Sequence, residues 1–328
     1  MFDLISFGEA MIRLSPPGFK RLEQTTTLDV NVGGAELNVA IGVSRLGLKS
    51  SWVSRLPDNP LGRMIANKAR ELDVDISHVV WDNQGRAGLY FLEFGATPRA
   101  SAVTYDRAGS SFSSIQPGEL DWDQILKGVK CLHVTGITPA LSPSAADVTV
   151  EALKKARKQG CAVSLDLNYR AKLWDSQTAQ NTLTPLMKYV NILITTSGDT
   201  RTVFGLEAQN DDRLARILLE QFPLDIVAVS IREGSSVWKC RWSGIARTRH
   251  AAYATRSYDI DIVDQVGRGD SFAAGFLYGY LSAADVQKGL DYGTAYAALK
   301  HSFPGDINWC TRREVETLMA GGRPGVSR

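Results

Sequence analysis

Along most of the chain, short apolar segments alternate with longer segments in which apolar residues recur every three or four positions. Segment 35–46 shows the second pattern clearly, and Gly47 would end a helix there. Its apolar face would consist of Leu37, Ala40, Ile41, Val43 and Leu46. The pattern predicts a turn at 58–62 that leads into a helix reaching about residue 72, and further helices at 144–158 and 213–222. It predicts strands at 4–7, 51–56, 131–135, 162–167, 190–195 and 226–231. Because such alternation is typical of sheets covered on both faces, we expect an α/β fold with a mostly parallel central sheet.

Two other segments, 89–94 and 102–105, alternate apolar and polar residues as antiparallel strands with one exposed face do. Together with segment 11–32 they could form one small sheet. Tyr90, Tyr105 and Arg107 would lie on its inner surface, and ordinary cross-strand packing is the alternative interpretation of the two tyrosines.

Length and composition limit the class of protein. The 328 residues suit one large domain over about 1–320, followed by a short tail at 321–328. The net charge of +2 favours neither nucleic acid nor an anionic membrane as partner. The four cysteines are widely spaced and predict ordinary thiols in a reducing compartment. The sequence has no signal peptide and no apolar run that could cross a bilayer, so we expect a soluble cytoplasmic protein.

A glycine-rich turn at 264–270 follows a predicted strand at 260–263 and precedes a long apolar helix. Gly267 and Gly269 would leave bare amide groups at the start of that helix, where peptide dipoles favour a phosphoryl group. Asp270 at the same place could accept the proton of an attacking hydroxyl. The alternative is that Asp270 only caps the helix.

A second glycine turn, at 33–34, also follows a strand and opens a helix that carries Asn38. Ligands of parallel sheets bind at the carboxyl ends of strands, so the two turns could meet at one edge. Tight packing at a strand-to-helix turn is the alternative reading. The sequence has no P-loop and no dinucleotide-binding glycine motif after its first strand, which argues against both of those nucleotide sites.

The run Asp264-Gln265-Val266-Gly267-Arg268-Gly269-Asp270, followed by Ser-Phe-Ala-Ala-Gly, resembles the C-terminal signature of the ribokinase-like (PfkB) sugar kinases. The resemblance implies a three-layer α/β sandwich in which 11–32 and 88–108 form a β-sheet lid. It also implies that Asp270 is the catalytic base and that Gly267, Arg268 and Gly269 complete the anion hole. Arg268 departs from the family, which prefers Ala or Gly there, but a backbone anion hole does not depend on that side chain.

Other segments resemble one subgroup, the 2-keto-3-deoxygluconate kinases: 11–18, 104–109, 166–174 and 300–306. The resemblance implies that Arg107 and Arg170 form a fork for a sugar-acid carboxylate, a geometry that guanidinium groups favour. Surface ion pairing is the alternative for each arginine. The implied sugar-binding residues are Gly34, Asn38, Tyr90, Tyr105, Arg107, Arg170 and Asp270.

The same resemblance implies ATP and Mg²⁺ as cofactors and leaves a monovalent cation such as K⁺ open. Asp199 stands where the family has the glutamate of an Asn-x-x-Glu motif and would act on magnesium indirectly. Arg232 replaces a glycine of the nucleotide loop, and 292–299 resembles the helix beside adenine. The implied nucleotide-binding residues are Asn168, Arg170, Ser197, Ser230, Arg232, Gly234, Gly267, Gly269 and Ala297.

These observations lead to one expected activity, the ATP-dependent phosphorylation of 2-keto-3-deoxygluconate at its terminal hydroxyl. A fructokinase or another neutral-sugar kinase is the first alternative, and a catalytically silent sugar-acid-binding regulator is the second. We also expect a homo-oligomer joined through lid strands, because exposed strand edges favour pairing.

Overall fold

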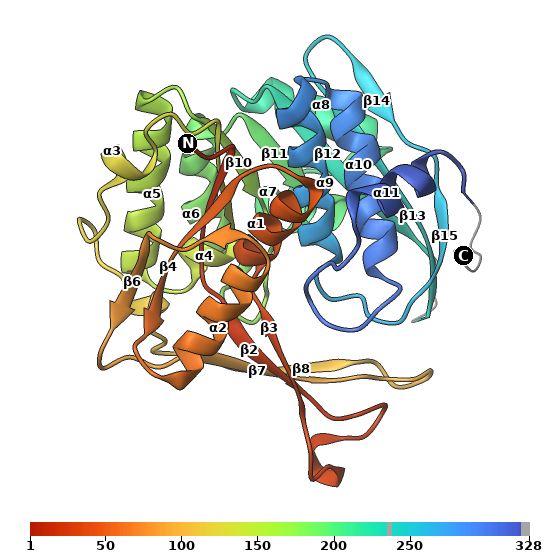
Figure 1. Cartoon of the computed structure of the whole chain (residues 1–328). Coiled ribbons are helices and arrows are strands. Elements are labelled where there is room, and N and C mark those ends of the chain that lie inside the picture. The colour runs from red at the N-terminus through yellow and green to blue at the C-terminus, as the bar shows by residue number, and fades with distance from the viewer. Residues whose placement is uncertain (235–237, 323–328) are drawn as a thin grey trace.

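The computed structural model describes residues 1–234 and 238–322, and its centre is an eleven-stranded sheet. The strand order is β14-β13-β12-β11-β10-β9-β1-β4-β5, with β15 paired to β13 and β6 paired to β4 (Figure 1). The pairs from β12 to β5 and β6 are parallel, whereas β13 runs antiparallel to its neighbours. The strands are β1 (Leu4–Phe7), β4 (Ser50–Pro57), β5 (Val74–Asp75), β6 (Val79–Asp82), β9 (Cys131–Thr135), β10 (Ala162–Asp166), β11 (Ile192–Thr195), β12 (Ile226–Glu233), β13 (Lys239–Arg247), β14 (Ala252–Ala254) and β15 (Tyr258–Asp261).

Helices cover both faces of this sheet (Figure 1). Successive strand residues point to opposite faces; Leu4 belongs to the core on one side and Ile5 to the core on the other. The first core includes α1 (Ala35–Leu46), α9 (Arg268–Ala283), α10 (Val286–Lys300) and α11 (Arg312–Met319). The second includes α5 (Pro143–Lys158), α6 (Ser176–Leu183), α7 (Ser197–Phe204) and α8 (Asp211–Gln221). The remaining helical elements are α2 (Pro60–Glu71), α3 (Trp122–Ile125), α4 (Ile137–Ala140) and three 3₁₀ turns at Leu22–Gln24, Phe112–Ser114 and Thr184–Tyr189. The predicted three-layer sandwich is confirmed.

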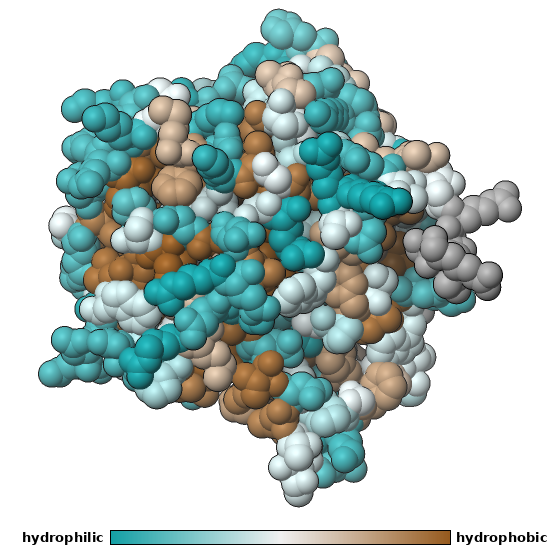
Figure 2. Space-filling model, viewed as in Figure 1, coloured by the Kyte–Doolittle hydropathy of each residue, from teal (hydrophilic) through white to brown (hydrophobic). Residues whose placement is uncertain are grey.

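A separate four-stranded sheet has the order β3-β2-β7-β8 and projects below the main body (Figure 1). Its strands are β2 (Met11–Ser15), β3 (Asp29–Gly33), β7 (Gly88–Glu93) and β8 (Ala102–Asp106). The central pair, β2 and β7, is parallel, and the two outer pairs are antiparallel. Apolar side chains, brown in Figure 2, gather over this small sheet among more polar neighbours. We call this small sheet the lid, and it occupies the segments that the sequence predicted for it.

The apolar run after Gly269 forms two helices, because Ala284 (φ 54°) ends α9 and Asp285 caps α10. The two helices pack backbone against backbone: a Cβ on Gly275 would lie 2.6 Å from the carbonyl oxygen of Tyr292. The hairpin strands β13 and β14 were not predicted. Of the predicted tail at 321–328, residues 323–328 lie outside the described part.

No helix in the described part is long and apolar enough to cross a membrane. The four cysteines, Cys131, Cys161, Cys240 and Cys310, are buried free thiols, as their spacing predicted.

Candidate active site

One cavity of about 700 Å³ lies where both glycine turns meet the lid. It is lined by almost all the residues that the sequence singled out: Gly34, Asn38, Tyr90, Tyr105, Arg107, Asn168, Arg170, Ser197, Asp199, Ser230, Arg232, Gly267, Arg268, Gly269 and Asp270. Two predicted nucleotide residues lie elsewhere. Gly234 lines a second cavity beside β13 and β15, and Ala297 is fully buried in the core of α10. Their roles stay predictions that the cavity lining does not support.

Asp270 lies in the first turn of α9 with 8% of its surface exposed. Asn38 Nδ2 donates to its carboxylate at 2.7 Å, so the two glycine turns do meet at one edge. The N-cap of α9 is Gly267, without a side-chain cap bond, so the interpretation of Asp270 as a simple helix cap is wrong. Burial raises the pKa of Asp270 to about 6, although Asn38 and Arg170 oppose that shift. A carboxyl group with this pKa can accept a proton near neutral pH.

The backbone around Asp270 explains Gly267. Gly267 has φ 79°, and a Cβ there would lie 2.0 Å from the carbonyl oxygen of Asp306, so no larger residue fits. Gly269 lines the cavity, and a Cβ there would meet nothing within 4 Å. The side chain of Arg268 turns back to Gln265 Oε1 at 2.8 Å. The turn can therefore present amide groups to an anion despite the unusual arginine.

Positive charge gathers on one part of the cavity wall. Arg170, Arg232 and Arg268 all line it, and burial together with the other two guanidinium groups lowers the pKa of Arg268. Burial also raises the pKa of Asp199. The pKa of Asp166 is raised well above its usual value by burial and by the nearby charges of Asp199 and Asp270. Burial therefore disfavours the charged forms of Arg268, Asp199 and Asp166. A polyphosphate with a bound divalent cation would bring charges of both signs to this wall and stabilise those charged forms.

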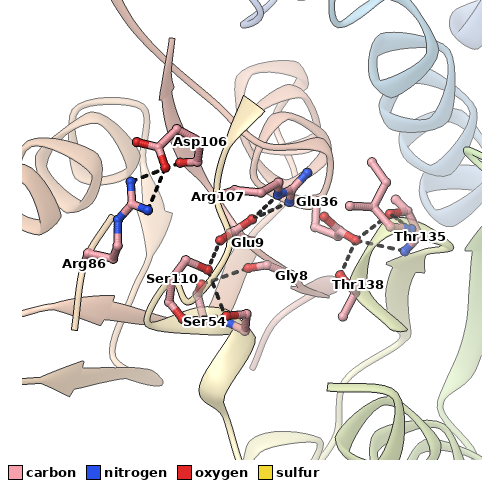
Figure 3. A network of polar contacts seen from close by, with 12 residues as sticks. Gly8, Glu9, Glu36, Ser54, Arg86, Asp106, Arg107, Ser110, Thr135 and Thr138 are labelled. Atoms are coloured by element: carbon pink, nitrogen blue, oxygen red, sulfur yellow. Dashed lines mark hydrogen bonds and ion pairs between the residues drawn. The ribbon is translucent and has the colours of Figure 1, made fainter. Parts of the chain in front are cut away.

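A pair of ionised groups that the sequence did not reveal lies at the lid side of the cavity (Figure 3). Arg107 donates to Glu9 Oε2 through Nε, at 2.9 Å, and through Nη2, and Ser110 donates to Glu9 Oε1. Only 2% of the Glu9 side chain is exposed. Arg107 is thus already paired with a carboxylate of the protein, and the fork of Arg107 and Arg170 stays a prediction. Glu9 lies two residues after the end of β1, and Arg170 lies four residues after the end of β10, so both follow strands of the central sheet.

Glu36 fixes the start of α1, the helix that carries Asn38 (Figure 3). Its Oε1 accepts hydrogen bonds from Thr135 N at 3.0 Å, Thr135 Oγ1 at 2.7 Å and Thr138 Oγ1 at 2.7 Å. Burial raises the pKa of Glu36. The helix is thereby tied to the end of β9, and Asn38 reaches Asp270 from a fixed position.

Arg13 joins the lid to the catalytic turn. This lid residue is 1% exposed; its Nη2 lies 2.7 Å from Asp264 Oδ2 and its Nη1 lies 2.8 Å from Asp306 Oδ1. Tyr90 also donates to Asp306. The sequence contains a signal for this contact, because Arg13 interrupts an otherwise apolar strand segment. A charged residue at a buried position requires a partner.

Within residues 1–234 and 238–322, no group of three or more His, Cys, Asp or Glu residues could hold a metal ion by itself. Magnesium usually binds through one or two carboxylates together with substrate phosphates. The carboxylates of Asp166 and Asp199 beside three arginines fit that mode, and the residues present therefore suit magnesium together with a nucleotide.

Comparison with known proteins agrees with this geometry. A family model described as pfkB family carbohydrate kinase matches residues 1–312. The chain is 37% identical to the 2-dehydro-3-deoxygalactonokinase of Haloferax volcanii, with 99% of both chains covered. It is 31% identical to the 5-dehydro-2-deoxygluconokinase of Shouchella clausii, over 92% of this chain and 91% of that one.

Among solved structures, the 2-dehydro-3-deoxygluconokinase of Thermotoga maritima is 40% identical and superposes with a TM-score of 0.93, covering 97% of this chain and 98% of that one. An E. coli protein described as a ribokinase II, in complex with ATP and Mg²⁺, has a TM-score of 0.86 over 98% of this chain and 100% of that one. At 18% identity, this second likeness shows the fold alone.

Proposed function

Because the chain belongs to the pfkB family of carbohydrate kinases, we propose that it transfers the γ-phosphoryl group of ATP to the terminal hydroxyl of 2-dehydro-3-deoxygluconate. The observation that carries this proposal is the environment of Asp270. Its carboxyl group is buried, has a pKa of about 6, and is held by Asn38 in the glycine turn that lines the cavity. A base and an anion hole therefore share one turn.

In this proposal Asp270 removes the proton of the attacking hydroxyl, and Asn38 keeps its carboxylate in line. The amides of the 267–270 turn stabilise charge on the transferred group. Arg232 and Arg268 bind the nucleotide phosphates. Magnesium, when bound, would neutralise phosphate charge, and Asp199 would orient the ion or its waters. The lid covers the sugar and excludes water, which would otherwise compete as acceptor.

The acidic end of the sugar requires a positive charge. Arg107 is neutralised by Glu9, whereas Arg170 donates only to the carbonyls of Asn168 and Tyr169 and forms no ion pair within the described part. We therefore assign the substrate carboxylate to Arg170. Arg107 and Glu9 act together as a neutral pair that offers hydrogen bonds to sugar hydroxyls.

Relatives named for three ketodeoxy acids leave the configuration of the acid open. The galactonate epimer is a second candidate, since a relative 37% identical over 99% of the chain carries that activity in its name. The test is ATP turnover, followed as ADP release, on 2-dehydro-3-deoxygluconate, 2-dehydro-3-deoxygalactonate, 5-dehydro-2-deoxygluconate, gluconate, ribose and fructose. The highest kcat/KM on the first of these is expected. A preference for fructose would support the neutral-sugar alternative, and no turnover on any sugar would support the silent regulator.

Two arginine variants separate carboxylate recognition from scaffolding. Arg170→Ala should lower kcat/KM for the sugar acid more than tenfold beyond its effect on fructose, because losing one partner of a desolvated charge pair costs roughly 2–5 kcal/mol. Arg107→Ala, the matched control, leaves Glu9 buried and unpaired and should depress all substrates alike. Equal losses in the Arg170 variant would contradict the assignment of the carboxylate.

A further inference from the structure

Lys300, the last residue of α10, is fully buried directly behind the catalytic turn. Its Nζ lies 3.4 Å from the carbonyl oxygen of Asp264 and 3.3 Å from that of Phe303. The ammonium also lies 5.2 Å from the centre of the Phe303 ring. Both of these hydrogen-bond partners are backbone carbonyls, and a lysine in such a place is unusual because burying an ammonium is costly.

The two carbonyls belong to two turns that are packed on each other. The carbonyl of His301 accepts from Val263 N at 2.7 Å, and Gly305 N donates to Asp264 Oδ2 at 3.0 Å. Gly267 lies against the backbone of Asp306. The 301–306 turn is thus the support on which the 264–267 turn rests, and the Lys300 ammonium bonds to both turns.

The charges around Lys300 balance. Asp264 and Asp306 supply two negative charges, and Arg13 and Lys300 supply two positive charges. Burial lowers the pKa of Lys300, whereas the neighbouring charges of Asp264, Asp306 and Asp270 oppose that shift and the charge of Arg13 adds to it. Removing the ammonium would leave one uncompensated negative charge and two carbonyls without a donor, close to where the transferred phosphoryl group would lie.

We propose that the Lys300 ammonium serves as a built-in monovalent cation that holds the anion-hole turn in place, so that catalysis needs no added K⁺. Backbone carbonyls are the groups that bind K⁺ in proteins, and an ammonium group is close to K⁺ in size and charge. Lys300 touches neither substrate and is a positioning residue. The inference rests on the proposed kinase activity and answers the question of a monovalent cation that the sequence left open.

The test compares four proteins in buffers that contain K⁺, NH₄⁺ or, as a bulky control cation, tetramethylammonium at equal ionic strength. The parent protein should keep its kcat within twofold in all three. Lys300→Ala opens space and should lose at least tenfold in kcat in tetramethylammonium, then recover at least threefold in K⁺ or NH₄⁺. Lys300→Met keeps the space filled and should lose activity without recovery. The exposed Lys158 provides a control, and Lys158→Ala should behave as the parent does.

A parent protein that requires K⁺ would overturn the proposal. A Lys300→Ala variant that is fully active without K⁺, or whose activity neither K⁺ nor NH₄⁺ restores, would overturn it too. The unfolding temperature reads the same site without turnover: K⁺ should raise it in Lys300→Ala and leave it unchanged in Lys300→Met. If the parent phosphorylates no sugar, the proposed function fails, and these unfolding temperatures still decide the role of Lys300. If Lys300→Ala does not fold, the K⁺ dependence of the parent remains decisive.

Discussion

Replacing Arg13 by Met should destabilise the protein far more than the loss of one ordinary ion pair. Arg13 is 1% exposed and contacts Asp264 at 2.7 Å and Asp306 at 2.8 Å, and those side chains are 0% and 5% exposed. Met fills a similar volume without charge, so both carboxylates lose their guanidinium partner. Asp264 keeps the amides of Val266 and Gly305, and Asp306 keeps Tyr90.

Breaking a buried pair by removing one partner costs about 3–5 kcal/mol. For an m-value of about 3 kcal/mol per molar urea, the midpoint of urea unfolding should therefore fall by about 1 M or more. Circular dichroism during urea titration measures this shift.

Arg86→Met is the matched control. Arg86 contacts Asp106 at the same 2.7 Å, but the two side chains are 41% and 53% exposed. Because exposed ion pairs contribute little, its urea midpoint should hardly move. Equal shifts for the two variants would refute the argument from burial.

A double variant tests the charge balance directly. Adding Asp306→Asn to Arg13→Met removes one of the uncompensated carboxylates, and the amide can still accept from Tyr90. Part of the lost stability should return. If Asp306→Asn lowers the urea midpoint of Arg13→Met as much as it lowers that of the parent protein, charge imbalance does not cause the instability of Arg13→Met.

Three further outcomes are expected. Asp270→Asn should lower kcat by about 10²–10⁴-fold without lowering the urea midpoint, as removal of a general base does; near-parental kcat would show that another group accepts the proton. Since only the ionised carboxylate accepts a proton and burial raises the pKa of Asp270 to about 6, kcat/KM should fall as the pH drops below about 6; a profile that stays flat to pH 5 would contradict this. The lid exposes 53% of Val30 on its edge strand β3, so light scattering at micromolar concentration should show a homo-oligomer, and a monomer with and without sugar would exclude pairing through the lid.

Local patterns were enough to locate most of the elements. The predicted strand at 4–7 and helix at 35–46 match β1 and α1 residue for residue, because an apolar run and a helical stripe report burial directly. The predicted meeting of the two glycine turns is also confirmed by the contact between Asn38 and Asp270. The rule behind this prediction, that the carboxyl ends of parallel strands lie at one edge, does not apply here, because β3 belongs to the lid and β15 is antiparallel to β13.

The partners of buried charges could not be obtained in this way. Arg13 pairs with Asp264, 251 positions away, and Arg107 pairs with Glu9, 98 positions away. Periodicity reports which face of an element is buried, but it does not report which other element covers that face.

The sequence by itself therefore determined the fold class, the two glycine turns and the position of Asp270, all of which depend on local backbone preferences. Only the tertiary structure decided which charges are balanced: Glu9 neutralises Arg107, while Lys300 stands among carbonyls behind the catalytic turn. The physical reason is that the energy of a buried charge depends on its nearest neighbours in space, and the packing of distant elements chooses those neighbours.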